Sequence, residues 1–206
     1  MHYEKTKYQD LSKVCIEKYG ESKGKEIYNQ AEQYMEQLLK EADYRKSEMV
    51  KWHMQKSIFP VLAYYKALLD SGYTCEEAYK NVLEQTQRYA LISKEKNKKI
   101  GKIPGAYSLF RIGVKKVMKK SFPVEGWETQ WVKNSKSEIH FNLKRCVYHE
   151  TVSHYGCPEL CTVFCQNDTT AFSGYLPKIV FQRSGTIGEG KAMCDFHFIN
   201  SKYIEK

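Results

Sequence analysis

The fold class is decided by WETQWVK at residues 127–133 and EIHFNLKR at residues 138–145. Both stretches alternate and carry residues that favour β-strands, and the polar residues 134–137 between them supply a turn. In the second stretch Ile139, Phe141 and Leu143 share one side, which predicts a buried face and a solvated face. The segment is therefore predicted to be a β-hairpin.

A second hairpin is predicted towards the C-terminus. Residues 178–183 and 191–199 have strand character, and glycines 185, 188 and 190 lie between them. Two short helices are expected between the hairpins, one over residues 146–155 and one that begins at Pro158 and runs to about Asp168. The result is an antiparallel sheet of about four strands with short helices inserted between two hairpins.

The first 121 residues have helical periodicity. The predicted features are a helix over residues 25–43, a second helix capped by Ser47 and broken or kinked at Pro60, a third opened by a Thr74/Glu77 capping box and ending near Ala90, and a fourth that follows Pro104 and ends near Ser121. Helices first and an antiparallel sheet later indicate an α+β protein. We expect one domain over residues 1–206, with a helical part (1–121) and a sheet part (122–206) that contains a Cys-rich helix at 157–168.

Composition excludes several classes of protein. Hydrophobic residues make up 42% of the 206 residues and aromatic residues 14%, which is sufficient for a core and excludes bulk disorder. The longest nearly apolar run, residues 58–69, is too short to cross a bilayer. The N-terminal residues do not resemble a signal peptide, so a cytoplasmic location is expected.

The net charge of +9 arises between Lys94 and Lys120. Residues 94–102 are expected to form a solvated loop, and residues 111–120 an amphipathic helix with a basic face. A nucleic-acid partner is not expected, because the chain has neither a known binding module nor interleaved stacking aromatics. The basic face is instead either solvated or attractive to a small anionic substrate.

Five of the seven cysteines lie in the last third of the chain. Without a secretory signal they are expected to be thiols. Cys157, Cys161 and Cys165 are spaced by four residues and Asp168 follows three later, so on a helix they share one face. This stripe either packs in the core or forms a site, and its spacing is not a known zinc or iron–sulfur signature.

The last predicted strand limits which residues can meet. Alternation places Cys194 on one face with Phe196, and Asp195 on the other face with His197. Without a bulge, Cys194 and Asp195 cannot both point into one pocket. The pair of Asp195 and His197 is either an acid/base pair or part of an exposed polar face.

Several motifs in order resemble those of one family. They are FPVLAYYKAL (59–68), FP with GW (122–123 and 126–127), Cys146, GCPELC (156–161) leading to Cys165 and Asp168, RSGT (183–186) and CDFHF (194–198). The sequence resembles the L-2-amino-thiazoline-4-carboxylic acid hydrolase-like proteins. The resemblance implies ring opening of a cyclic isothiourea towards N-carbamoyl-cysteine, although a fold does not fix a substrate.

Chemistry suggests a role for each candidate residue. Cys165 is the expected nucleophile, and Asp168 is expected to hold the amidinium group of the substrate. Asp195 and His197 would form the acid/base pair. Arg183 would bind the substrate carboxylate, with Cys146 and Cys194 completing the pocket. No cofactor is required in this hypothesis.

A metal site is the competing hypothesis. Cys146, Cys165 and Cys194, with Asp168 or a histidine, are alternative ligands for zinc, whose bound water would then be the nucleophile. In a closed site the same zinc would be structural, and the protein would be a non-catalytic binding module. A third possibility is a ligand-binding accessory protein of a biosynthetic pathway. The sequence determines neither the oligomeric state nor the exact substrate.

Overall fold

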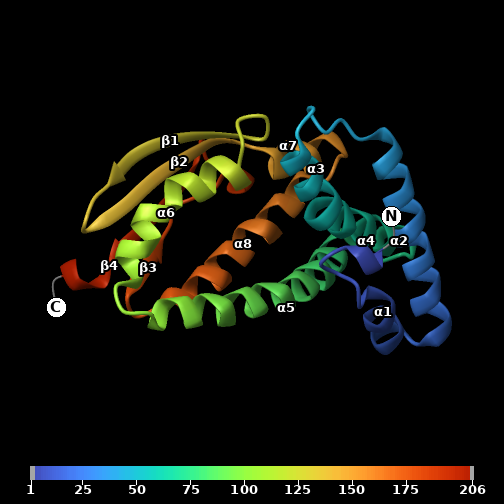
Figure 1. Cartoon of the computed structure of the whole chain (residues 1–206). Coiled ribbons are helices and arrows are strands. Elements are labelled where there is room, and N and C mark those ends of the chain that lie inside the picture. The colour runs from blue at the N-terminus through green and yellow to red at the C-terminus, as the bar shows by residue number, and fades with distance from the viewer. Residues whose placement is uncertain (1–2, 205–206) are drawn as a thin grey trace.

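A computed structural model describes residues 3–204 and confirms the predicted α+β arrangement (Figure 1). The helices of the first part are α1 (Leu11–Tyr19), α2 (Glu21–Glu41), α3 (Glu48–His53), α4 (Phe59–Asp70), α5 (Cys75–Lys102) and α6 (Ala106–Ser121). The sheet part contains β1 (Trp127–Asn134), β2 (Glu138–Cys146), α7 (Val147–His154), α8 (Cys161–Phe172), β3 (Ile179–Gln182) and β4 (Cys194–Asn200). Helices α5 and α8 run side by side and connect the two parts.

Two predicted helix starts are confirmed by their caps, whereas the helix predicted over residues 25–43 is α2 and begins earlier, at Glu21. Ser47 Oγ accepts the backbone N–H of Val50 at 3.4 Å, and Thr74 and Glu77 form the complete capping box. The helix does not end at Pro60, as a helix-breaking proline would require. A π-helical turn at Met54–Ile58 joins α3 to α4, and Pro60 lies in the first turn of α4, where its missing N–H costs little.

The loop predicted over residues 94–102 is wrong, because α5 continues as a helix to Lys102. Its lysines and Asn97 lack an apolar period, but tertiary contacts hold this part of the helix. Asn97 donates to the carbonyl of Ala171 at 2.9 Å, and a Cβ at Gly174 would lie 2.2 Å from the carbonyl of Lys94. The close approach of residues 173–175 therefore extends α5 until Pro104 and Gly105 end it.

Both predicted hairpins are present and pair with each other. The sheet order is β1-β2-β4-β3, with antiparallel neighbours throughout, and the short helices lie between β2 and β3. Register shifts in β1 distort the edge of the sheet.

One face of the sheet packs against α6 and α8. Phe110 of α6 lies 5.0 Å from Phe198 between ring centroids, and Phe172 of α8 lies 4.9 Å from Phe181 and 5.1 Å from Phe198. The alternation predicted for β2 and β4 is confirmed, since Ile139 and Phe141 are buried on this inner face. The inner face thus positions Cys194 towards α8.

The Cys-rich helix differs from its predicted boundaries of 157–168. Residues 158–160 form a 3-10 turn, and α8 then runs from Cys161 to Phe172. Cys157 precedes the turn and its thiol donates to the carbonyl of Tyr155 at 3.6 Å. Pro158 starts a 3-10 turn rather than the α-helix itself, so Cys157 does not join the stripe of thiols.

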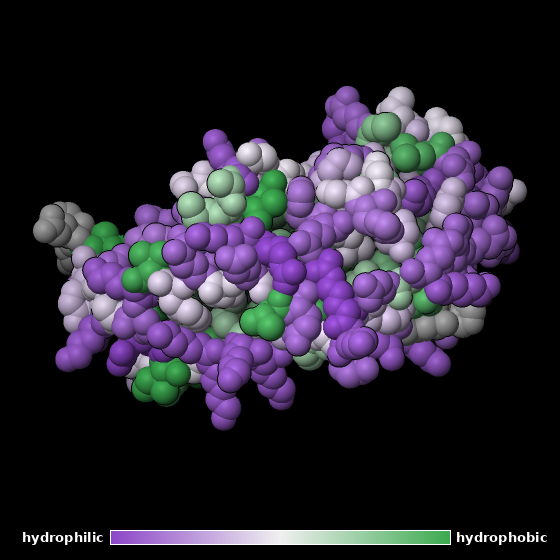
Figure 2. Space-filling model, turned by 90° about the horizontal axis from the view of Figure 1, so that it is seen from above, coloured by the Kyte–Doolittle hydropathy of each residue, from purple (hydrophilic) through white to green (hydrophobic). Residues whose placement is uncertain are grey.

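The basic residues of α6 face solvent. The predicted helix and its exposed lysines are present, and Tyr107 and Val114 are buried. The predicted apolar face is wrong in part, because Ile112 is 72% and Val117 57% exposed. Seen from above, hydrophilic residues cover most of the surface and hydrophobic ones form separate spots (Figure 2). Within residues 3–204, none of the helices combines the length and apolar character needed to span a membrane.

Candidate active site

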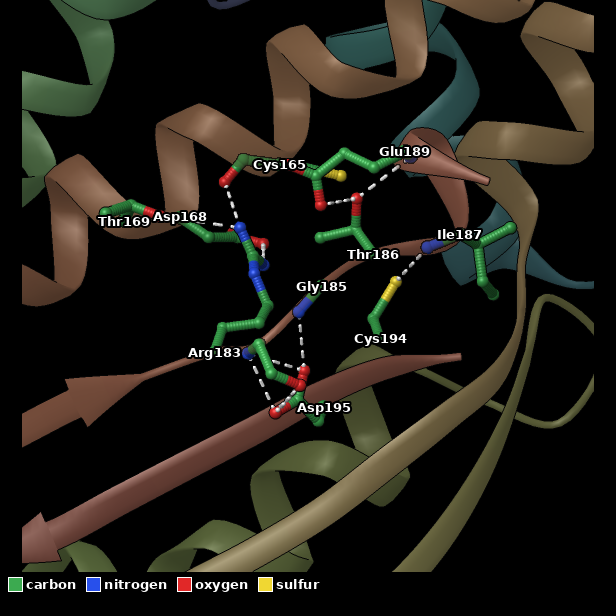
Figure 3. Close-up of polar contacts among 11 residues, drawn as sticks. Cys165, Asp168, Thr169, Arg183, Gly185, Thr186, Ile187, Glu189, Cys194 and Asp195 are labelled. Atoms are coloured by element: carbon green, nitrogen blue, oxygen red, sulfur yellow. Dashed lines mark hydrogen bonds and ion pairs between the residues drawn. The ribbon is translucent and has the colours of Figure 1, made fainter. Parts of the chain in front are cut away.

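An open cleft of about 770 Å³ lies beside α8, at the end of β3 and β4. This volume is in the range of small-molecule sites. Its lining residues come from α8 (Thr162, Cys165, Gln166, Thr169), from β3 and the following loop (Phe181, Gln182, Arg183, Ser184, Gly185, Glu189) and from β4 (Asp195, His197). Figure 3 shows several of these side chains converging from the helix, the loop and the strand.

Cys165 is the thiol of this cleft whose surroundings favour the thiolate. A hydrogen bond from Cys161 is the largest influence and lowers the pKa of Cys165, against the opposing effect of burial. The Thr186 side chain and the Arg183 guanidinium lower it further, whereas the charge of Asp168 raises it. Cys161 and Cys165 titrate as a pair. Because Thr186 and Arg183 act on Cys165, a negative charge on the pair is favoured at Cys165.

The other thiols of the cluster favour the neutral form. Cys146, Cys161 and Cys194 lie near enough to Cys165 for their charges to interact. Burial is the largest influence on Cys146 and Cys194, and it raises their pKa values to about 12 and about 11. The sulfur of Cys194 also accepts the N–H of Ile187 at 3.2 Å. Cys194 therefore anchors the loop after β3 and is not part of the cleft lining.

Arg183 is committed to α8. Its Nη1 lies 3.3 Å from Oδ2 of Asp168, and its Nη2 donates to the carbonyl of Cys165 at 2.6 Å. The guanidinium lies over the rings of Phe181 and Phe196, and its side chain is 9% exposed. The structure therefore brings Arg183, Asp168 and Cys165 together, with both terminal nitrogens of Arg183 engaged within the protein.

Asp168 lies where protein surrounds the carboxyl group, yet 40% of its side chain remains accessible. Burial among protein atoms is the largest influence and raises its pKa to about 6, while Arg183 opposes this rise. Solvent access to the side chain screens this effect of burial. Asp168 is best described as the ionic partner of Arg183.

The loop after β3 is anchored from both sides. Both carboxylate oxygens of Asp195 accept the N–H of Ser184 at 2.9 Å, and Oδ1 accepts the N–H of Gly185 at 3.0 Å. On the other side, a Cβ added at Gly188 would lie 3.0 Å from Sγ of Cys161. A side chain at Gly188 would therefore force Cys161 or the loop to move, so this glycine lets the loop pack directly against α8.

Asp195 is an ionised anchor in this arrangement. Burial acts to raise its pKa, but the hydrogen bonds from Ser184 and Gly185 outweigh it, and the pKa is lowered overall. Asp195 does not contact His197 by a hydrogen bond. Instead, Nε2 of His197 pairs with Oε2 of Glu138 on the neighbouring strand, and its ring lies 5.0 Å from that of His140. Asp195 and His197 both line the cleft, next to the C-terminal end of β3.

Thr186 and Glu189 are the site residues that the sequence analysis missed. Thr186 is 1% exposed, its hydroxyl donates to Oε2 of Glu189 at 2.9 Å, and it accepts the N–H of Glu189 at 3.2 Å. Thr186 is a neighbour of Cys165, and Glu189 lines the same cleft as Cys165 (Figure 3). The signal was present in the sequence, because Thr-x-x-Glu at 186–189 is a capping pattern.

The zinc hypothesis does not fit this arrangement. Cys146, Cys165 and Cys194 are close enough for their charges to interact, but all are free thiols, and the sulfur of Cys194 already accepts the N–H of Ile187. In the described part of the chain, residues 3–204, His, Cys, Asp and Glu side chains do not gather in any group of three or more that could hold a metal ion. No step of the chemistry below is therefore derived from a metal.

Comparison with known proteins supports the resemblance noted in the sequence. Searches of curated proteins and of solved structures found no match to this chain. The family model described as L-2-amino-thiazoline-4-carboxylic acid hydrolase matches residues 51–198. This range includes α4 to α8, β1 to β3, most of β4 and every residue of the cleft lining. The chain therefore belongs to the L-2-amino-thiazoline-4-carboxylic acid hydrolase family.

Proposed function

We propose that the protein is a hydrolase that opens a cyclic isothiourea, such as 2-amino-thiazoline-4-carboxylate, through a covalent bond to Cys165. Membership of the family supports a hydrolase, since the name denotes hydrolysis of this thiazoline. The observation that carries the proposal is the thiolate-favouring environment of Cys165 in an open cleft. A thiolate is the form of cysteine that attacks carbon.

The first step exchanges one carbon–sulfur bond for another. The Cys165 thiolate attacks the ring carbon that carries the amino group, and a bond forms between this carbon and Sγ. The electron pair of the ring carbon–sulfur bond leaves with the ring sulfur, which becomes a thiolate. An ordinary thiol has a pKa of about 8.5, so this thiolate leaves readily and takes its proton from water.

The second step releases the product. Water adds to the amidine carbon of the Cys165 adduct and loses its protons to nitrogen and solvent. The bond to Sγ then breaks, which regenerates the thiolate of Cys165 and leaves a carbamoyl group on the substrate nitrogen. The sum of the two steps is the addition of one water to the ring, and the product is a carbamoyl-cysteine.

The surrounding residues support Cys165 in distinct ways. Arg183 was expected to bind the substrate carboxylate, but its terminal nitrogens are engaged, so we propose that it stabilises the thiolate and that Asp168 holds it in place. Cys146 and Cys194 remain neutral thiols behind the reacting sulfur. For Asp195 and His197 we propose support of the loop and of the sheet, in place of acid/base catalysis.

Mass spectrometry of the protein with 2-amino-thiazoline-4-carboxylate tests this proposal. The expected result is formation of carbamoyl-cysteine and, in rapidly quenched samples, an adduct of the intact substrate on the peptide that contains Cys165. Turnover without any adduct, combined with full activity of Cys165→Ser, would overturn the covalent route. Absence of turnover would overturn the assignment of this substrate.

A further inference from the structure

The charge of the cleft differs from the charge of the whole protein. The basic excess of residues 94–120 lies on α5 and α6, and none of those residues lines the cleft. The charged lining residues are Arg183, Glu189 and Asp195, together with the titratable His197. The positive charge of α5 and α6 therefore does not indicate the charge of the groups that line the cleft around Cys165.

The positive charge of Arg183 is already compensated. Asp168 forms an ion pair with it, and the thiolate of Cys165 is a second negative group beside it. Asp195 is satisfied by the N–H groups of Ser184 and Gly185 and by the Ser184 hydroxyl. Glu189 is the remaining charged residue of the cleft lining.

Glu189 is fixed in place but only partly used. The Thr186 hydroxyl donates to its Oε2 at 2.9 Å. Its Oε1 has no hydrogen-bond partner among residues 3–204, and Glu189 is exposed at the cleft. Gly190, with a φ of 80°, ends the short turn after Glu189, and the N–H of Glu189 is bonded to Thr186. The carboxylate is thus held by Thr186, which is also a neighbour of Cys165, in the cleft that Cys165 and Glu189 both line (Figure 3).

We propose that Glu189 binds a cationic amidinium or isothiouronium group of the substrate and makes the cleft selective for a cation. A carboxylate and an amidinium form paired charge-assisted hydrogen bonds. The opposite charge also favours the protonated form of the substrate group, which is the form most open to attack by a thiolate. This inference rests on the proposed function only for the identity of Cys165 as the nucleophile, and it assigns Glu189 a role in specificity.

Protection of Cys165 from alkylation tests the inference without turnover. The probes are 2-amino-2-thiazoline, a cationic cyclic isothiourea without a carboxylate, and thiazolidin-2-one, its neutral isostere. Iodoacetamide labelling of Cys165 is followed by peptide mass spectrometry at each probe concentration. We expect the cation to slow labelling and the isostere to have no effect at the same concentration.

The variant Glu189→Gln keeps the size of the side chain and an oxygen for Thr186. It should weaken protection by the cation by at least about tenfold, as expected for loss of a charged hydrogen bond. The variant Glu189→Asp, which retains the carboxylate, should recover part of the protection. Glu128→Gln on the exposed surface of β1 is the matched control and should behave like the wild type.

The outcomes separate this inference from the proposed function. Equal protection by both probes, or unchanged protection in Glu189→Gln, overturns the role of Glu189 even if 2-amino-thiazoline-4-carboxylate is hydrolysed. Selective protection that depends on Glu189, without any hydrolysis of that compound, supports the cation site and overturns the proposed substrate.

Discussion

The two faces of β4 carry different chemistry although their residues alternate along one strand. On the inner face, Cys194 points towards α8 and its sulfur accepts the N–H of Ile187 near the thiol cluster. On the outer face, Asp195 holds the loop through Ser184 and Gly185, and His197 pairs with Glu138. Asp195 and His197 are close in sequence, but each is engaged by a different partner.

The two faces of β4 therefore separate the residues near the reacting thiol from the residues that anchor the loop and the sheet. The inner side presents the reacting thiol, its cation and the carboxylate of Glu189, whereas the outer side fixes the loop that carries Thr186 and Glu189. Outer residues therefore act on the chemistry through the loop. Variants on the inner side should change the reaction most, and variants on the outer side should change it less.

Replacement of the nucleophile has the largest expected effect. Cys165→Ser should lower turnover by at least about 1,000-fold, because removal of a nucleophile abolishes the covalent route. The matched control is Cys75→Ser, since Cys75 is exposed and distant from the cleft lining. Steady-state rates on 2-amino-thiazoline-4-carboxylate measure both. Comparable rates for Cys165→Ser and the control would contradict the assignment.

Removal of the Thr186 hydroxyl comes next. Thr186→Val should raise the pKa of Cys165, because the Thr186 side chain contributes to lowering it in the folded protein. The pH dependence of Cys165 alkylation measures this shift directly, and Thr170→Val, on α8 but outside the cleft lining, provides a comparison. An unchanged pH profile would show that Thr186 acts only as a helix cap.

Loss of the outer anchor should have a smaller effect on the reaction. Asp195→Asn keeps the side-chain shape but loses the charge that accepts the loop N–H groups, so we expect about threefold slower turnover and about 1 kcal/mol less stability at pH 7. Because the pKa of Asp195 is lowered in the folded protein, its stabilisation is present above the unfolded pKa of about 3.9 and is lost as pH falls through the folded value.

Urea unfolding at pH 7 and at pH 3 measures this difference. The stability gap between the wild type and Asp195→Asn should narrow at the lower pH. A gap of equal size at both pH values would contradict the anchoring charge. An effect on turnover as large as that of Cys165→Ser would restore Asp195 as a catalytic residue.

Replacement of His197 should have the smallest effect. Its Nε2 is engaged by Glu138 on the outer face, so His197→Gln should change turnover by less than about threefold and leave the shape of the pH–rate profile unchanged. Rates from pH 5 to pH 9 provide the measurement. Loss of one limb of the pH–rate profile in His197→Gln would identify His197 as a catalytic acid or base. It would also contradict the view that the outer face of β4 carries only supporting residues.

Local patterns predicted much of the fold. The Thr74/Glu77 capping box, the alternation of β2 and the two faces of β4 follow from residue spacing alone, and all are present. The helical segment at residues 94–102 was missed because it is held by residues 171–175, which are more than 70 positions away in the sequence. Asn97 donates to the carbonyl of Ala171, and Gly174 packs against the carbonyl of Lys94. Such contacts leave no local period in the sequence.

The site was predictable only in part for the same reason. The spacing of Cys161, Cys165 and Asp168 on one helix was visible, and the structure brings Arg183 to them. The position of Thr186 and Glu189 beside Cys165 depends on Gly188 packing on Cys161, which is a contact between segments distant in the chain. The commitment of Arg183 to Asp168 likewise required the packed structure.

The rate of alkylation of each cysteine as a function of pH tests the central claim most directly. Peptide mapping after brief exposure to iodoacetamide compares Cys165 with exposed Cys75 in the same sample. The account predicts that Cys165 reacts fastest at neutral pH and that its rate reaches a plateau at a lower pH than that of Cys75. Slower reaction of Cys165 than of Cys75 at neutral pH, with a rise only above pH 9, would contradict the claim that the cleft holds a reactive thiolate.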